Sequence, residues 1–276
     1  MRVAISISLL LLGAIVPSAA QDTHTDAGRH AILDQILDLY VRDGLVYYRA
    51  LKTERAPLDS YVAALAEAPI GSASRDDQLA FWLNAYNALV LRTVIDHYPI
   101  PRRTSDYPLG SIRQIPGAFE RLQHRVAGRS VTLDQIEQTV LSAFHDPRVY
   151  LALGRGAIGS GRRRSEVFVP GRLETQLTDV ASECITHTQC IDIDRDNDKT
   201  TISAVFSWRE QDFVAAYAGA ANARFNSRSP IERAVLAFIE PKLLSAEKAF
   251  LAKNEFPVVY KPFDWSLNDL TGRGGR

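Results

Sequence analysis

The residues best suited to chemistry lie in one short segment, Gly154–Arg164. The segment holds four glycines and four arginines in eleven residues and contains no acid. Glycine lets the backbone come close to a ligand, and arginine presents a planar fork to carboxylate or phosphate. Backbone N–H groups of such a turn form a concave anion site. The sequence therefore predicts an anion-binding loop, whose ligand-binding residues would be Arg155, Gly156, Gly159, Arg162 and Arg164.

A second kind of chemistry centres on Ser160, in the same loop. Its hydroxyl could act as a nucleophile if a base were in reach, and histidine most often supplies that base. We take His145 as the candidate base, with three alternatives: His97, His124 and His187. The elbow pattern of hydrolases is absent, because Ile158 stands where its first glycine belongs. A hydrolase or acyl transferase that uses Ser160 is therefore the alternative function. An exposed basic loop without a ligand is the third interpretation, and the sequence leaves all three open.

The first twenty residues predict an export signal. Arg2 precedes an apolar run, Val3–Val16, and small residues follow up to Ala20, where a signal peptidase would cut. The run of 14 residues is shorter than the roughly 20 that a membrane-spanning helix needs. Residue 21 is Gln21 and not the cysteine of a lipoprotein. We expect a soluble protein, secreted or periplasmic, with no membrane attachment once the signal is removed.

The net charge of the chain limits the kinds of partner we expect, and its length limits the number of domains. Lys plus Arg equals Asp plus Glu, at 32 each, so no overall field attracts nucleic acid. We expect no nucleic-acid partner, and an anionic small molecule or peptide as the ligand. The remaining 256 or so residues, 21–276, fit one large domain.

The two cysteines, Cys184 and Cys190, stand six positions apart with His187 between them. In an oxidising compartment such a pair normally forms a disulfide. A zinc site would need a fourth ligand, which this segment does not supply, and two free thiols are the other alternative. The sequence predicts a disulfide and no metal site.

Two patterns that suggest a cofactor or a metal fail in detail. Gly154, Gly156 and Gly159 have the spacing of a dinucleotide fingerprint, but no clear helix or correctly placed acid follows. The acidic turn after Asp192 resembles a calcium loop, yet Asn197 replaces its glycine and Ser203 its closing glutamate. We expect no cofactor.

The element at the centre of the chain is a predicted buried helix that contains Phe81–Arg92. Its apolar residues run all the way round the helix axis, which is typical of a helix without a solvent face. Asn84 and Asn87 interrupt them, and buried amides need partners. We expect these two amides either to tie neighbouring loops to the core or to hold a functional loop.

The remaining elements follow from periodicity and turn residues. Helices are expected over His30–Val41, Leu58–Ala68, Thr132–Phe144, Leu173–Cys184, Trp208–Ala223 and Ser229–Asn254, the last of these interrupted at Pro241. Strands are expected over Val46–Tyr48, Phe119–Val126, Ser130–Val131, Val149–Leu153, Ile191–Ile193, Thr201–Phe206 and Val258–Tyr260. The fold class is α+β, a helix-rich single domain around the central helix with a small, mainly antiparallel sheet and a docked C-terminal tail.

Several motifs along the chain resemble the family catalogued as domain of unknown function 547. The resemblance covers about residues 75–216 and extends to the tail. The resemblance implies an α+β domain, and it suggests a relationship with papain-like thiol enzymes. The motifs are Phe81–Leu89, Ser111–Arg113, Leu133–Glu137, Asp146–Val149, Trp208–Phe213 and Asp264–Asn268.

The chain departs from the family where thiol chemistry would lie. After its Asp-Pro-Arg motif the family usually carries a histidine, a cysteine and a second cysteine, and the matching residues here are Tyr150, Arg155 and Ser160. If thiol chemistry belongs to the family, this chain has lost it. The resemblance thus implies an altered centre and slightly favours an interaction protein over an enzyme.

Overall fold

Helix α4, Arg75–His97, is the element around which the protein is built. The computed structural model describes residues 26–271. Ser74 caps α4 by accepting a hydrogen bond from the backbone N–H of Asp77 at 3.2 Å, and the helix ends at His97, ahead of Pro99. Its side chains from Leu79 to Leu91 are all buried. The central helix predicted from the sequence is confirmed.

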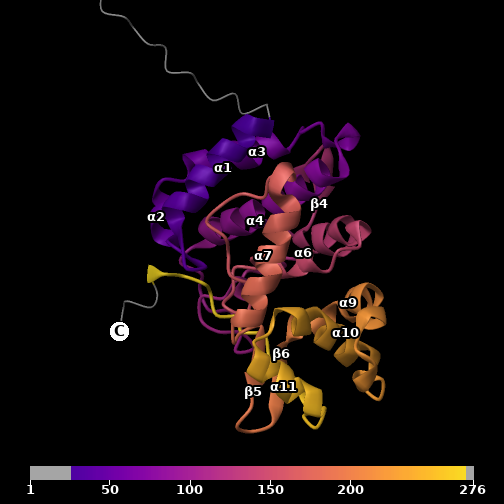
Figure 1. Cartoon of the computed structure of the whole chain (residues 1–276). Coiled ribbons are helices and arrows are strands. Elements are labelled where there is room, and N and C mark those ends of the chain that lie inside the picture. Colours follow the sequence, from indigo (N-terminus) through magenta and orange to yellow (C-terminus); the bar gives the residue numbers. More distant parts are fainter. Residues whose placement is uncertain (1–25, 272–276) are drawn as a thin grey trace, which may run out of the picture.

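Of the three N-terminal helices, the second and third pack on this central helix and the first packs on the third, in the upper part of Figure 1. Two short strands form a hairpin between the first two of these helices, and a 3-10 turn at Ile70–Ser72 leads into α4. The bounds are α1 Asp26–Tyr40, β1 Val41–Arg42, β2 Leu45–Val46, α2 Tyr48–Thr53 and α3 Ala56–Leu65.

The middle of the chain adds a hairpin and a series of helical segments. A 3-10 turn at Ile112–Gln114 precedes the hairpin of β3, His124–Val126, and β4, Arg129–Val131, which is antiparallel as predicted. Thr132 then opens α5, Leu133–Gln135, through the capping box that its sequence predicted. The helix continues as a π-helix over Ile136–Leu141 and as a 3-10 turn over Ser142–Phe144.

The sequence prediction was wrong at Val149–Leu153, which we expected to be a strand. The structure has helix α6 there, Arg148–Leu151. Asp146 accepts a hydrogen bond from the backbone N–H of Arg148 at 3.0 Å and so caps the turn. A short apolar run has no periodicity that separates a buried helix from a buried strand, and this cap decides between them.

The C-terminal third forms a three-stranded sheet with helices beside it, in the lower part of Figure 1. The strand order is β5-β6-β7, with β5 antiparallel to β6 and β7 parallel to β6. The expected helix over Ser229–Asn254 is interrupted at Pro241, as predicted. The bounds are α7 Leu173–Thr186, β5 Ile191–Asp194, β6 Lys199–Ser203, α8 Ala204–Trp208, α9 Glu210–Tyr217, α10 Pro230–Ile239, α11 Ser245–Lys253 and β7 Val258–Lys261, with 3-10 turns at Pro170–Arg172, Ala218–Ala220, Ala223–Phe225 and Glu240–Lys242.

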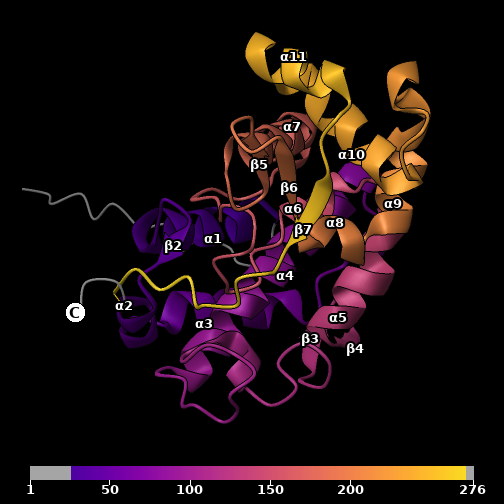
Figure 2. The same ribbon diagram turned by 90° about the horizontal axis from the view of Figure 1, so that it is seen from below.

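The C-terminal tail docks on the core. Figure 2 shows it, in yellow, running from β7 across the molecule towards α2. Asp269 bridges Val46 of β2, and Leu267 bridges Ala157 of the glycine- and arginine-rich loop. The tail therefore joins the N-terminal hairpin, the loop and the C-terminal sheet in one α+β domain that is helix-rich, as predicted.

The predicted export signal, residues 1–20, lies outside the described residues. Within residues 26–271 we find no helix of the length and apolar character needed to cross a membrane.

Candidate functional site

The loop Gly154–Arg164 is held against the central helix by the two asparagines singled out in the sequence. Asn87 accepts a hydrogen bond from the backbone N–H of Gly154 at 2.9 Å and donates one to the carbonyl of Ala152 at 3.2 Å. Asn84 makes the same two-way contact with the backbone of Phe168, at 2.8 and 2.9 Å. Both amides thus fix the backbone that enters and follows the loop.

Two of the exposed or half-buried arginines of the loop pair with acids elsewhere in the chain. Arg162 pairs with Asp43 at 2.7 Å, and Arg164 pairs with Glu166 at 2.6 Å. Arg163 is buried, donates to the carbonyl of Gly154 at 2.6 Å, and has its pKa lowered by burial. The loop is therefore not a uniformly basic surface, although its own sequence contains no acid.

Ser160 supports the loop from within. Its hydroxyl accepts the backbone N–H of Arg155 at 2.9 Å, and no hydrogen bond joins it to a histidine or a carboxylate among the described residues. Ser160 lines a surface cavity of about 220 Å³ together with Arg162 and His187. His145, the candidate base, does not line that cavity; it ends the turn after Phe144 with a φ of +53°.

Arg155 turns inward and reaches a buried carboxylate, Glu137. Its Nη2 donates to Oε1 at 2.8 Å and its Nε to Oε2 at 3.2 Å. Arg209 donates to the same Oε1 at 2.9 Å, and the Tyr86 hydroxyl donates to Oε2 at 3.3 Å. Glu137 lies on the π-helix, a geometry that is frequent at functional sites.

Glu137 is bonded to two arginines, and a second carboxyl, that of Asp134, acts on both of them from nearby. Burial alone would raise the pKa of Glu137, but Arg155 and then Arg209 outweigh it and lower the pKa to about 2. The carboxylate is therefore ionised, and two guanidinium groups share its single negative charge. The cluster lies in a medium of low dielectric, where charged groups act strongly on one another.

An open cleft of about 170 Å³ lies over this cluster. The Arg113 guanidinium lies in it between two rings, 4.5 Å from the Phe119 centroid and 4.6 Å from that of Trp265. Trp208 stacks on Trp265, with centroids 6.1 Å apart and planes at 21°. The lining consists of Arg113, Phe119, Asp134, Glu137, Gln138, Arg155, Trp208, Arg209 and Trp265. We call this space the Arg113 cleft.

Asp134 supplies a carboxyl group to the wall of the cleft. Burial raises its pKa, and the nearby Glu120 carboxyl raises it further. Glu120 also accepts a hydrogen bond from Arg113 at the rim of the cleft. Arg113, Arg155 and Arg209 thus face two lining carboxyls, of which Asp134 takes up a proton more readily than an ordinary aspartate.

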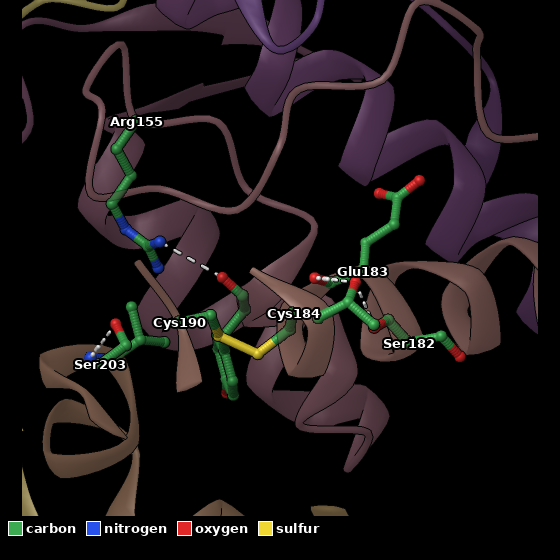
Figure 3. Close-up of a disulfide and its surroundings, with 9 residues drawn as sticks. Arg155, Ser182, Glu183, Cys184, Cys190 and Ser203 are labelled. Carbon is green, nitrogen blue, oxygen red and sulfur yellow. Dashed lines mark hydrogen bonds between the residues drawn. A yellow bond between two sulfur atoms is a disulfide. The ribbon is translucent and has the colours of Figure 1, made fainter. Parts of the chain in front are cut away.

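The disulfide predicted between Cys184 and Cys190 is confirmed and joins α7 to the turn that precedes β5. Figure 3 shows Arg155 extending toward this bond from the loop. Arg155 donates to the carbonyl of Tyr150 at 3.2 Å, and the Tyr150 ring lies 4.3 Å from the Arg209 guanidinium. Neither cysteine is a free thiol.

Sequence reasoning missed the Arg113 cleft as a site. Among the residues that line the cleft, the sequence predicts a ligand-binding role for Arg155 alone. The other lining residues come from segments far apart in the chain, and most of them lie in motifs on which the family resemblance rests. Those motif residues are Arg113, Asp134, Glu137, Trp208, Arg209 and Trp265.

Comparison with known proteins gives a resemblance to a family and no function. Residues 70–185 match the family model described as "Protein of unknown function, DUF547", so the resemblance is confirmed over these residues. No curated protein and no solved structure matches the chain. The relationship with papain-like enzymes stays a prediction.

Proposed function

We propose that this protein binds an anionic small molecule in the Arg113 cleft. The observation that carries the proposal is the composition of the Glu137 cluster, in which Arg155 and Arg209 share one carboxylate. With Arg113, the lining of the cleft holds three arginines against the two carboxyls of Glu137 and Asp134, and a bound anion would balance the third arginine. Arg155 belongs to the loop that the sequence marked for anion binding, so the loop contributes through its buried face.

Arg113 is the residue best placed to contact the ligand. Its side chain is 25% exposed, whereas those of Arg155 and Arg209 are 3% and 7% exposed and already paired with Glu137. The rings of Phe119 and Trp265 hold its guanidinium in place, which reduces the entropy lost on binding. Its partner Glu120 is 48% exposed, and an ion pair of that kind contributes little. A ligand carboxylate can therefore replace Glu120 at Arg113.

Calorimetric titration with a panel of carboxylates and phosphates tests the proposal. We expect at least one member to bind and the variant Arg113→Gln to lose roughly tenfold or more in affinity, because a charge-assisted hydrogen bond contributes about 1.5–3 kcal/mol. Arg125→Gln is the matched control, since Arg125 is a 60% exposed arginine on β3 that pairs with Glu67 outside the cleft. Equal loss in both variants, or no binding by any member, would overturn the proposal.

We also propose that the protein is exported, because Arg2 and the apolar run Val3–Val16 have the pattern of a signal sequence. The test is mass spectrometry of the protein recovered from the extracytoplasmic fraction of its own cells. Cleavage should leave Gln21 as the first residue. Recovery of the uncut chain in the cytoplasm alone would contradict export.

A further inference from the structure

We infer that the ligand of the Arg113 cleft is a carboxylated sugar ring, a hexuronate unit. This inference rests on the proposed function and adds the chemical class of the ligand. Three features of the cleft carry it: an exposed aromatic platform, a pair of polar side chains beside that platform, and the small volume of the cleft.

The platform is Trp208. It is 44% exposed although it lies among other rings, with Phe263 at 4.9 Å and Trp265 at 6.1 Å between centroids. These rings, with the Arg155 guanidinium 5.8 Å from the indole centroid, fix the orientation of the indole, and the residue stays partly exposed where it lines the cleft. The axial C–H groups of a pyranose ring present a flat apolar face that packs on an indole with little loss of entropy.

The polar pair is Asp134 and Gln138. They are four positions apart on the continuous helical segment formed by α5 and the π-helix, and both line the cleft. A carboxyl accepts hydrogen bonds from hydroxyl groups, and an amide both donates and accepts them. Neither group is needed for a simple inorganic anion, for which Arg113 would suffice. Together they fit the neighbouring hydroxyl groups of a sugar.

The volume of the cleft and the charge of Arg113 indicate the size and the charge of the ligand. The cleft holds about 170 Å³, below the roughly 300–1,000 Å³ of ordinary small-molecule pockets, so one ring with one carboxylate fills it. The Arg113 fork matches the geometry of a carboxylate. Because the cleft is open, the remainder of a longer glycan can extend into solvent.

An aromatic or alicyclic acid is the nearest competitor, since it would stack on Trp208 and pair with Arg113 equally well. Such a ligand would bury part of Asp134 and Gln138 without giving them partners. A site built to bond hydroxyl groups discriminates against analogues that lack them, because its own polar groups are then left unpaired. This difference separates the two classes in an experiment.

The experiment is a titration of the full chain with four probes: glucuronate, glucose, cyclohexanecarboxylate and inorganic phosphate. Affinity is measured by calorimetry, and contact with the platform by NMR of the indole N–H signals, assigned with a variant for each of the three tryptophans. We expect glucuronate to bind at least tenfold more tightly than glucose or cyclohexanecarboxylate and to shift the Trp208 signal. Trp208→Ala should lose about tenfold in glucuronate affinity, and Trp208→Phe should keep most of it.

Tyr260→Ala is the matched control, because Tyr260 is a 43% exposed aromatic residue on β7 that does not line the cleft. The inference is overturned if cyclohexanecarboxylate binds as tightly as glucuronate, or if Trp208→Ala and Tyr260→Ala behave alike. In either case an anion whose binding depends on Arg113 would leave the proposed function standing. If none of the charged probes binds, both the proposed function and the inference fail.

Discussion

Arg155 and Glu137 face each other inside the protein as a two-pronged ion pair, with N–O distances of 2.8 and 3.2 Å. Their side chains are 3% and 8% exposed. By resemblance, the family carries a thiol at position 155. The same arginine also contacts the residues at the family's other two positions, through the carbonyl of Tyr150 and the hydroxyl of Ser160. In this chain the three positions form one structural unit centred on a positive charge.

The first prediction concerns the stability of that pair. Arg155→Met removes one partner of a buried carboxylate, which typically costs about 3–5 kcal/mol. Because Arg209 remains bound to Glu137, we expect a loss near the lower end, about 3 kcal/mol in urea denaturation. Arg162→Met, which breaks the exposed pair with Asp43, is the control and should cost less than about 1 kcal/mol. Similar losses in the two variants would contradict a stabilising role for the buried pair.

The second prediction is a loss of stability in acid. The pKa of Glu137 falls from its ordinary value of 4.5 to about 2 in the folded protein, because Arg155 and Arg209 outweigh the effect of burial. A lowered carboxyl pKa stabilises the fold above the unfolded value, and this stabilisation disappears as the pH falls toward 2. The contribution is about 3 kcal/mol. Urea denaturation between pH 5 and pH 2 should show it.

Two variants identify the group responsible for the acid effect. Glu137→Gln should flatten the pH dependence of the unfolding free energy, whereas Glu67→Gln, at a 74% exposed site, should leave its slope unchanged. An identical slope in the Glu137→Gln variant and the unmodified protein would assign the acid sensitivity to other carboxyls.

The third prediction concerns the disulfide. Cys184 and Cys190 are six positions apart, so their bond closes a short loop. Restriction of the unfolded chain by a loop of that size contributes about 2 kcal/mol. Denaturation with and without a reducing agent should differ by this amount. In the variant with both cysteines replaced by alanine, the reducing agent should have no effect, and an effect there would mean that the reagent acts elsewhere.

Local signals were sufficient for much of the fold. The apolar content of α4, the capping box at Thr132, the glycine turn after Ala127 and the spacing of the two cysteines each lie within a few residues, and each prediction from them is confirmed. The strand prediction for Val149–Leu153 was wrong because this apolar run is too short to show a helical or strand period. The hydrogen bond that starts a helix there comes from Asp146, outside the run.

The site could not be found in the same way. The charge of the Gly154–Arg164 loop was visible in the sequence, but its compensating acids Asp43, Glu137 and Glu166 lie outside the loop. Which arginine meets which acid depends on tertiary packing. The Arg113 cleft likewise combines segments more than a hundred residues apart, and apart from Arg155 only the family motifs marked members of it in advance.

The fourth prediction tests the alternative of a serine enzyme. Ser160 accepts the Arg155 N–H, and no base is bonded to it, so a fluorophosphonate probe should leave no adduct on the folded protein. Ser160→Ala should cost about 1–2 kcal/mol, because it leaves a buried N–H without its partner. Ser207→Ala, an exposed serine on α8, should cost less than about 0.5 kcal/mol. Covalent labelling that disappears in Ser160→Ala would establish Ser160 as a nucleophile.

The fifth prediction concerns close packing of the loop against α6. A Cβ at Gly161 would lie 2.1 Å from the backbone oxygen of Leu151, well inside contact distance. This oxygen belongs to the backbone of a buried helix and cannot move aside as a flexible side chain would. Gly161→Ala should therefore cost about 3 kcal/mol, at the upper end of typical overpacking.

Gly171→Ala is the matched control for this effect. A Cβ there meets nothing within 4 Å, and the residue lies in a 3-10 turn with no positive φ. That substitution should be neutral or stabilise by up to about 1 kcal/mol, since alanine restricts the unfolded chain. Urea denaturation of the two variants separates steric exclusion at Gly161 from the general effect of replacing glycine. If both variants unfold at the same urea concentration, the loop does not pack on Leu151 as described, and the inward path of Arg155 to Glu137 loses its support.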